Sequence, residues 1–119
     1  MLPAAHRLRR SADIVRVTKS GVRVRRGSVV VHLAARGGAP QATAPRFGYA
    51  VGRSVGNSVI RHLVTRRLRS ISRLLVPELR AGSDVVIRAL PEAANATFSQ
   101  LQRDVQLAVQ KAQGPAASR

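Results

Sequence analysis

Residues 56–75, GNSVIRHLVTRRLRSISRLL, decide the fold. At about 100° per residue, the step of an α-helix, the apolar and basic side chains fall on opposite arcs. The apolar arc spans about 140° and contains Ile60, Leu63, Val64, Leu68, Ile71, Leu74 and Leu75. The opposite arc contains Arg61, His62, Thr65, Arg66, Arg69 and Arg73. The pattern predicts a helix over residues 57–76, closed by Pro77, with one face on a sheet. Arg67 falls inside the apolar arc, where its charge must extend to solvent or meet a partner.

The basic face of this helix has two interpretations. A merely solvated face normally interleaves acids that pair with its bases at i,i+4, but this helix contains no acid, and the next one along the chain is Glu78. Exposed arginines without counter-charges repel one another, and an anionic partner removes that cost. The sequence therefore favours a nucleic-acid face over a solvated one.

The segment before the helix, residues 51–57 (VGRSVGN), contains Gly52 and Gly56. Glycines at a strand-to-helix turn allow the backbone to approach a phosphate, which the amides of the helix N-terminus would then bind. They equally serve a tight turn that needs positive φ. The glycines alone leave both alternatives open, and the segment is not a P-loop, because no Gly-Lys-Ser/Thr ends it.

Outward from this helix, the pattern predicts a single α+β domain over residues 1–113, in the order α-β-β-β-α-β-α, with a four-stranded sheet packed against helices. A first helix over residues 12–20 has Ser11 as its N-cap and Gly21 as its stop. Thr97 and Gln100 form a capping box that opens the last helix, which runs to about residue 113. The strands are expected at 22–25, 28–34, 46–51 and 84–89. Residues 1–10 read as an irregular basic arm, residues 36–45 as a flexible loop and residues 114–119 as a disordered tail.

The third strand, the basic helix and the fourth strand form a βαβ crossover if the two strands run parallel. Such a unit is right-handed by default. The sequence itself does not test its hand.

Composition points to a polyanionic partner. The 119 residues carry 21 Lys and Arg against 5 Asp and Glu, a formal net charge of +16. Nearly all the bases are Arg, whose planar guanidinium binds phosphate in a bidentate manner and stacks on bases. With 45% apolar but only 3% aromatic residues, the core must consist of Val, Leu, Ile and Ala.

The same totals exclude several classes. There is no Cys, so disulfides and thiolate zinc sites are excluded. No apolar stretch of about 18 residues and no signal-peptide core appears, so we expect no membrane span and no export. We therefore expect a cytoplasmic protein.

Three stretches of the chain carry a family resemblance. Residues 56–69 resemble the signature of the bacterial ribonuclease P protein, roughly G-N-x-V-x-R-N-R-x-K-R-x-x-R, through Gly56, Asn57, Val59, Arg61, Arg66 and Arg69. The start, Leu2-Pro3 followed by HRLRRSAD at 6–13, is similar to the family's opening, and DVVI at 84–87 to its last strand. The resemblance extends from about residue 2 to residue 110.

The chain also departs from the family pattern. His62 and Leu63 stand where the family has Asn and Arg, and Thr65 where it often has Lys. Ile14 and Thr18 replace two Phe of the first helix, and Ala89-Leu90 replaces a basic pair after the fourth strand. Contacts at those positions do not carry over.

The resemblance implies an α-β sandwich related to the second domain of ribosomal protein S5, in the protein subunit of the enzyme that removes the 5′ leader from precursor tRNA. The basic helix and arm would contact the catalytic RNA subunit through Arg7, Arg9, Arg10, Arg53, Asn57, Arg61, His62, Arg66, Arg69 and Arg73. The sheet side would contact the leader through Arg16, Lys19, His32, Arg46 and Tyr49. Tyr49 is either a stacking platform or a core aromatic that shares strand parity with Phe47.

We expect no catalytic side chain in this protein. The acids are scattered singly, whereas a two-metal nuclease needs clustered carboxylates; convergence of distant acids stays an alternative. His32 and His62 could act as an acid/base pair, although a lone histidine is more often structural. The resemblance implies that Mg²⁺ bound mainly by the RNA subunit performs the hydrolysis, and that the protein holds no metal or small-molecule cofactor.

Two rival functions remain. A small ribosomal or RNA-chaperone protein would share the size and charge without any processing activity. A sequence-specific DNA binder is disfavoured, because the strand-flanked helix lacks the two-helix core of a helix-turn-helix.

Overall fold

The computed structural model describes residues 6–8, 10–36 and 44–114. Its long elements follow the predicted order. They are α1 (Ser11–Ser20), β1 (Val22–Arg26), β2 (Val29–Ala35), β3 (Arg46–Ala50), α2 (Ser58–Leu75), β4 (Ser83–Ala89) and α3 (Phe98–Gln113). Two short 3-10 helices, η2 (Val76–Glu78) and η3 (Pro91–Ala94), lie on either side of β4 in the chain.

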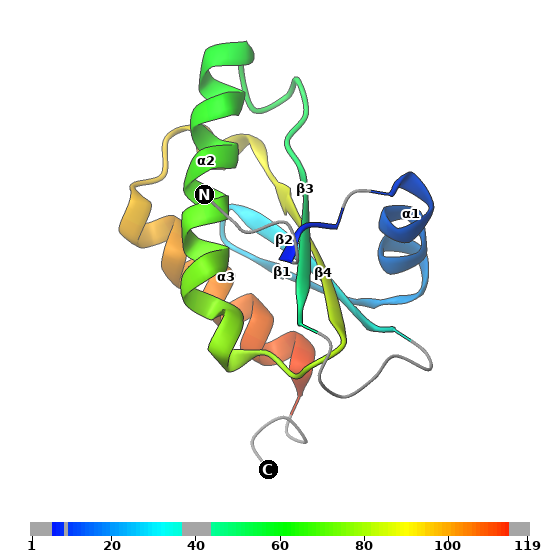
Figure 1. The fold of residues 1–119 in the computed structure, drawn as a ribbon. Coiled ribbons are helices and arrows are strands. Elements are labelled where there is room, and N and C mark those ends of the chain that lie inside the picture. The colour runs from blue at the N-terminus through cyan, green and yellow to red at the C-terminus, as the bar shows by residue number, and fades with distance from the viewer. Residues whose placement is uncertain (1–5, 9, 37–43, 115–119) are drawn as a thin grey trace.

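The four strands form one sheet in the order β1-β2-β4-β3. The β1–β2 and β2–β4 pairs are antiparallel, and β3 runs parallel to β4. Helices α2 and α3 cover one face of the sheet, and α1 lies against the other (Figure 1). The result is a three-layer arrangement in which the two faces of the sheet meet different helices.

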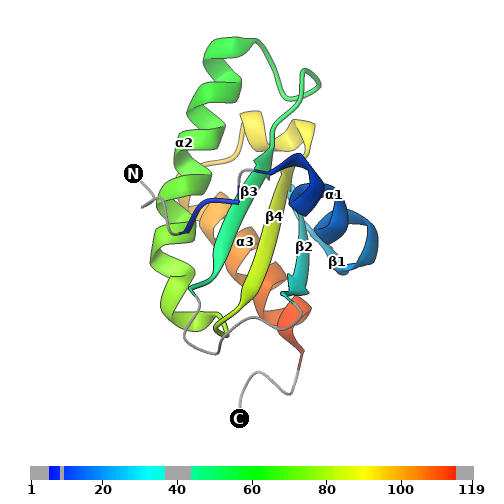
Figure 2. The ribbon, with the colours of Figure 1, turned by 45° about the vertical axis from the view of Figure 1, so that its right-hand side comes forward.

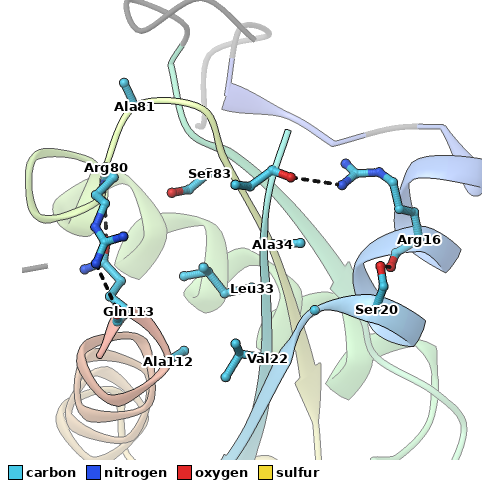
Figure 3. Close-up of a pocket in the computed structure, with 12 residues that line it drawn as sticks. Arg16, Ser20, Val22, Leu33, Ala34, Arg80, Ala81, Ser83, Ala112 and Gln113 are labelled. Atoms are coloured by element: carbon cyan, nitrogen blue, oxygen red, sulfur yellow. Dashed lines mark hydrogen bonds between the residues drawn. The ribbon is translucent and has the colours of Figure 1, made fainter. Parts of the chain in front are cut away.

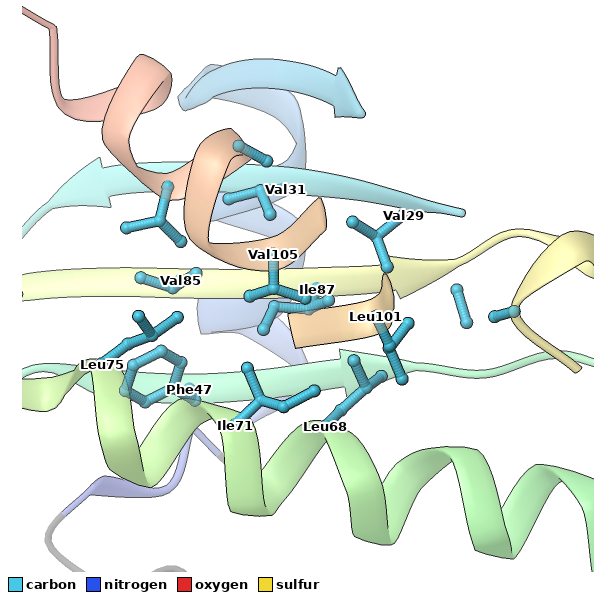
Figure 4. Close-up of a cluster of buried hydrophobic side chains, with 14 of the residues drawn as sticks. Val29, Val31, Phe47, Leu68, Ile71, Leu75, Val85, Ile87, Leu101 and Val105 are labelled. Atoms are coloured by element: carbon cyan, nitrogen blue, oxygen red, sulfur yellow. The ribbon is translucent and has the colours of Figure 1, made fainter. Parts of the chain in front are cut away.

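The β3–α2–β4 crossover exists, because its two strands are parallel neighbours. Its hand differs from the default. Seen from the α1 side in Figure 2, β3 and β4 point the same way with β4 to the right of β3, while the helical layer lies behind the sheet. Figure 4 shows the same unit from the helix side. Both views give a left-handed crossover, where most such units are right-handed.

The main core lies between the sheet and the pair α2–α3 (Figure 4). Because side chains of a strand alternate between faces, the odd-numbered residues of β2, β3 and β4 supply its floor. These include Val29, Val31, Phe47, Val85 and Ile87. Helix α2 contributes Leu68, Ile71 and Leu75, and α3 contributes Leu101 and Val105. As expected from the composition, Val, Leu, Ile and Ala dominate this core.

A smaller core lies on the opposite face, under α1. Leu8, Val17 and Val86 are buried there, with Ile14 and Ala34 packed against them. Leu8 comes from the segment predicted as an irregular arm. Its amide donates to the Phe47 carbonyl at 2.7 Å, beside a parallel bridge between Arg7 and Phe47. Residues 6–8 of that segment are therefore anchored along the edge of β3.

The helix ends test the capping predictions. The capping box of Thr97 and Gln100 is confirmed, with both reciprocal hydrogen bonds present. Gly21 follows the last residue of α1 as predicted; a Cβ there would lie 2.8 Å from the Leu33 carbonyl oxygen. The prediction that Ser11 caps α1 is wrong. Ser11 is the first helical residue, and the preceding Arg10 makes no side-chain cap.

Candidate nucleic-acid interface

The outer surface of α2 carries exposed cations. Arg66, Arg69 and Arg73 are exposed, and we call them the α2 arginine face. Buried Val64, Leu68, Ile71 and Leu75 hold the opposite side of the helix on the sheet. No ion pair joins the arginine face to an acid in the described part of the chain. These arginines point outward, as predicted, and remain available to an external anion.

One flank of α2 contacts the edge strand β3. Tyr49 donates a hydrogen bond from its hydroxyl to Ser72 Oγ at 2.9 Å, and the Arg69 guanidinium lies 6.0 Å from the Tyr49 ring centre. Tyr49 packs against the main core together with Phe47. Burial raises the pKa of Tyr49 to about 12. Of the two alternatives for Tyr49, the structure agrees with the core aromatic, because the ring lies on the α2 side of the sheet and packs against the main core.

Two further arginines of α2 are partly buried. Arg61 lies on the same flank as Arg69, and its Nε has no hydrogen-bond partner in the described residues. Arg67 lies on the other flank and donates from Nη1 to the Ala96 carbonyl at 3.1 Å, just before α3 begins. This contact explains the arginine inside the apolar arc: the half-buried side chain brings its charge to a backbone carbonyl.

The turn that precedes α2 is held by its own contacts. Asn57 is the N-cap, and its side-chain oxygen accepts from the Ile60 amide at 3.0 Å. Gly56 has a φ of 158°, and a Cβ there would lie 2.9 Å from Ile60 Cγ2. Gly52, in contrast, faces open space. Gly56 is thus required by the turn itself, where a side chain would collide with Ile60. Arg53 and Asn57 are both exposed in this turn.

The other face of the sheet forms a second basic surface. A groove of about 460 Å³ lies beside the carboxyl-terminal half of α1, and we call it the α1-side groove. Its lining is Thr18, Arg23, His32, Ala50, Val86 and Arg88. The strand register explains why these residues meet, since Arg23 pairs with His32, His32 with Val86, and Ala50 with Arg88.

His32 forms the floor of this groove. It is only 5% exposed, and its Nδ1 has no hydrogen-bond partner in the described residues. Burial lowers the pKa of His32, and the neighbouring Arg23 and Arg88 guanidiniums lower it further. The imidazole is therefore neutral at pH 7, so the positive charge of the groove comes from its two arginines.

A buried carboxylate organises the end of the sheet near the start of β3. Asp84 is fully buried and binds three guanidiniums. Arg46 approaches it in a bidentate manner, with both contacts at 2.9 Å, and Arg36 donates at 2.8 Å. Arg16 completes the cluster from α1. This cluster ties α1 and the segment after β2 to the central strand.

Arg16 also borders a pocket of about 620 Å³ at the end of the sheet (Figure 3). In that view Arg16 lies on one side, and Arg80, which donates to the Gln113 carbonyl at 2.9 Å, lies on the other. Leu33 and Val22 point toward α3, and Ala34 points toward α1. Both arginines already have partners within the protein.

The structure distributes the predicted site residues over distinct places. On or beside α2 lie Arg53, Asn57, Arg61, His62, Arg66, Arg69 and Arg73. Arg10 is exposed and Arg7 half-buried, while Arg9 lies outside the described residues. The five leader candidates do not form one surface: His32 is in the α1-side groove, Lys19 is exposed on α1, Arg16 and Arg46 bind Asp84, and Tyr49 is on the α2 side.

Sequence reasoning missed three arginines of these surfaces. Arg23 and Arg88 line the α1-side groove, and Arg36 binds Asp84. A signal for Arg23 was present, because it alternates with Val22 and Val24 in a strand whose Val24 is buried. Arg36 had no signal, since it stands at the start of a Gly-, Ala- and Pro-rich segment without periodicity.

The titratable groups are dispersed. No three His, Asp or Glu side chains of the described residues are grouped so as to hold a metal ion. Asp84 binds arginines, and Asp104 accepts from the amide and hydroxyl of Ser28 at 3.1 and 2.9 Å. His32 and His62 do not meet: His32 lies on the α1 side of the sheet, and His62 is on the outer surface of a helix that covers the other side.

No helix in the described residues combines the length and apolar character that a membrane crossing requires.

Comparison with known proteins gives one family throughout. The family model for Ribonuclease P matches residues 2–113. The ribonuclease P protein component of Salinispora tropica is 43% identical over 100% of this chain and 98% of its own length. That of Nocardioides is 47% identical over 89% of this chain and 90% of its own.

Solved structures agree with this relationship. The Staphylococcus aureus RNase P protein superimposes with a TM-score of 0.78 and 25% identity, covering 92% of this chain and 95% of its own. The Thermotoga maritima RNase P protein, 21% identical, shares the fold with a TM-score of 0.75 over 88% of this chain and 96% of its own. A sequence match over nearly the full length and the same arrangement of sheet and helices lead to one conclusion: this chain belongs to the ribonuclease P protein family.

Proposed function

We propose that this chain is the RNA-binding protein subunit of a ribonuclease P and assists a catalytic RNA in the endonucleolytic removal of the 5′ leader from precursor tRNA. The relatives named as ribonuclease P protein components support the assignment. The observation that carries it is the α2 arginine face, three exposed guanidiniums without a carboxylate partner in the described residues. An RNA backbone supplies the missing counter-charge.

The two basic surfaces suggest a division of labour. The α2 arginine face, with Arg53, Asn57 and His62 beside it, binds the RNA subunit. The α1-side groove binds the single-stranded leader, whose phosphates contact Arg23 and Arg88. Because the sheet lies between the surfaces, the protein bridges its two RNA partners. Lys19, exposed on α1, extends the leader surface.

In this proposal the RNA subunit performs the chemistry, with Mg²⁺ that it binds itself, and the protein supplies binding energy and charge screening. Four of the five acids support this division because they are engaged elsewhere. Asp84, Asp104, Glu92 and Asp13 contact Arg or Ser residues of the protein. Each phosphate that the protein neutralises steepens the dependence of log K on log salt by about 0.9 on a duplex and about 0.7 on a single strand. A cytoplasmic location stays part of the proposal.

Reconstitution with a ribonuclease P RNA tests the assignment. At a Mg²⁺ concentration where the RNA alone is slow, added protein should accelerate cleavage of precursor tRNA at the mature 5′ end. A ribosomal or RNA-chaperone protein would bind the RNA without this gain. Preference for duplex DNA over structured RNA at matched salt would instead indicate a DNA-binding protein. Either result would refute the assignment.

The division of labour needs a second experiment. Arg23→Ala with Arg88→Ala should weaken binding of precursor tRNA to the holoenzyme while leaving binding of mature tRNA and of the RNA subunit unchanged. Arg103→Ala, which removes an exposed arginine of α3, is the matched control and should leave all three affinities unchanged. Equal losses for precursor and mature tRNA would show that the groove does not bind the leader.

A further inference from the structure

The first turns of α2 carry an apolar surface that no other element of the described residues covers. Val59 is 75% exposed, more than any other large hydrophobic side chain of the described residues. His62 is exposed and Leu63 half-buried beside it. These three residues, which we call the shelf, line a shallow depression of about 620 Å³ together with Ser58 and Arg66. In Figure 1 this end of α2 projects beyond the sheet. Ile60 and Val64 of the same turns face the main core, whereas the shelf lies on another side of the helix.

Helix geometry connects the shelf to the arginine face. Residues 59, 62, 63 and 66 follow the i, i+3, i+4, i+7 spacing and therefore occupy one side of the helix. The same side continues through Arg69 to Arg73. From Val59 to Arg73 the helix rises about 21 Å at 1.5 Å per residue. An apolar and aromatic patch thus lies at the N-terminal end of a line of guanidiniums.

The chemistry around the shelf restricts its occupant. Its lining contains a guanidinium, an imidazole and a hydroxyl but no carboxylate. A protein partner would need to bring an apolar group and an acidic surface together. An RNA strand offers both within each nucleotide, since an unstacked base presents an apolar face and is joined to a phosphate. Side chains such as His stack on such bases in single-stranded loops and bulges.

We propose that the shelf binds one unpaired nucleobase of the RNA subunit, with the base against Val59 and Leu63, the His62 imidazole stacked on it, and its phosphate on Arg66. This inference rests on the proposed function and deepens it. The shelf gives α2 a contact that depends on base exposure, whereas the arginine face responds only to phosphates. The protein would thereby select an RNA with an unstacked base at one position along the helix.

Salt dependence separates the two kinds of contact. A phosphate contact releases counterions, so its loss lowers the slope of log K against log salt by about 0.7 to 0.9. Loss of an apolar contact weakens binding without changing that slope. Affinity for the RNA subunit is therefore to be measured at several KCl concentrations, with the free protein's melting temperature as the check on folding.

The key variant is Val59→Ser with Leu63→Ser. We expect about tenfold weaker binding, from the apolar area lost, with an unchanged slope and an intact fold. Val22→Ser is the matched control, because Val22 is 52% exposed and lies on β1, away from α2. Arg66→Ala is the comparator and should lower the slope. His62→Ala should weaken binding several-fold, and His62→Phe should restore it, because Phe retains a stacking surface without the imidazole.

Chemical probing identifies the base. The wild-type protein should protect one unpaired base of the RNA from modification at its Watson–Crick edge, and the Val59→Ser, Leu63→Ser double variant should leave that base reactive. Unchanged affinity of the double variant alongside tight wild-type binding would overturn the shelf proposal and leave the proposed function standing. If the wild type sediments as a dimer and the double variant as a monomer, the shelf would instead be assigned to a contact with a second copy of this chain. Failure of the wild type to bind the RNA would reject the proposed function itself.

Discussion

Among single residues, Asp84 neutralises part of the excess positive charge in the interior of this protein. One fully buried carboxylate binds Arg16, Arg36 and Arg46. The hydrogen bond to Asp84 is the main reason that the pKa of Arg46 is raised. A buried charge whose partner is removed is costly. Here the loss of Asp84 would leave three guanidiniums facing one another.

We therefore expect Asp84→Asn to lower the free energy of unfolding by about 3 to 5 kcal/mol, the cost of breaking a buried ion pair from one side. Urea denaturation followed by circular dichroism measures this. Arg25→Ala is the control, because Arg25 and Glu92 form an exposed pair at 3.7 Å, and such pairs contribute about 1 kcal/mol or less. Equal effects of the two substitutions would mean that Asp84 is not the organising charge.

The Tyr49 hydroxyl should make the stability of the protein depend on pH in the alkaline range. Its pKa is raised to about 12, above the ordinary value of about 10. Between these values the unfolded chain loses the phenolic proton and the folded protein retains it. Stability should therefore be complete below pH 10 and decrease as the pH rises from 10 towards 12. Tyr49 is the single Tyr and there is no Trp, so ultraviolet absorbance reports its ionisation directly.

The matched variant for that titration is Tyr49→Phe. It should remove the tyrosinate signal and flatten the stability profile in this pH range, although it loses the hydrogen bond to Ser72. A midpoint near 10 in the folded wild type would contradict the burial of this ring.

The contacts of individual side chains were the feature that the sequence predicted least well. Periodicity assigned Phe47 and Tyr49 to one face of a strand but could not say which face the helices would cover. Arg16 and Arg46 looked like free cations because their partner, Asp84, is distant in sequence from both. A pairing between elements that meet only after folding leaves no local pattern.

At the scale of elements, two adjacent arginines of α2 should behave differently. Arg66 is exposed, whereas Arg67 donates to the Ala96 carbonyl. We expect Arg66→Ala to lower the salt slope of RNA binding by about 0.7 to 0.9 with little change in stability. Arg67→Ala should lower stability by about 1 kcal/mol with the slope unchanged. Salt titration of binding and thermal unfolding of the same two variants decide this, and identical behaviour would show that the helix faces are assigned incorrectly.

The turn between β1 and β2 supports another element-scale prediction. Gly27 has a φ of 55°, a conformation that costs L-residues roughly 1 to 2 kcal/mol. A Cβ there would also lie 2.5 Å from Asp104 Oδ1, and Asp104 holds the turn to α3 through Ser28. Gly27→Ala should therefore destabilise the protein by about 2 kcal/mol or more.

A double-mutant cycle separates these two causes. If Asp104 is displaced by the new methyl group, Gly27→Ala should cost less in an Asp104→Ala background than in the wild type. Additive effects would attribute the whole loss to the backbone conformation.

The sequence predicted elements well. The strands lie within one residue of their expected bounds, because β-branched runs and turn residues delimit them. One error came from placing the whole apolar arc of α2 on the sheet. Leu74, placed on the inward arc, is 57% exposed, because the sheet covers a narrower sector than the apolar arc. Ser11 failed as a cap because hydroxyl residues at a helix start can equally occupy the first turn.

For the whole molecule, the order and class of the fold followed from the chain, but the hand of the crossover did not. The general preference for right-handed units rests on strand twist, and no local motif signals an exception. The sequence predicted the arm only in part, because Leu8 is buried in the smaller core, next to the bridge that Arg7 forms with Phe47 of β3. The family motifs added what periodicity lacked: an expected partner for the arginine face.

Net charge gives a prediction for the molecule as a whole. At +16, the folded protein concentrates its cations within a body of 39 × 28 × 26 Å. The screening length is about 30 Å at 0.01 M salt and about 10 Å at 0.1 M. At low salt, repulsion therefore acts across the entire molecule, and at moderate salt only between neighbours. Unfolding relieves this repulsion, so the melting temperature should rise by several degrees between these NaCl concentrations.

A charge-reduced variant separates screening from other effects of salt. Arg66→Glu with Arg73→Glu lowers the net charge by four at exposed positions. Its melting temperature should start higher at 0.01 M NaCl and rise less, because there is less repulsion to screen. Calorimetry of both proteins across the salt series measures the difference. A wild-type melting temperature that stays flat or falls would mean that the arginines are already neutralised within the fold, and an RNA partner would then have no charge to relieve.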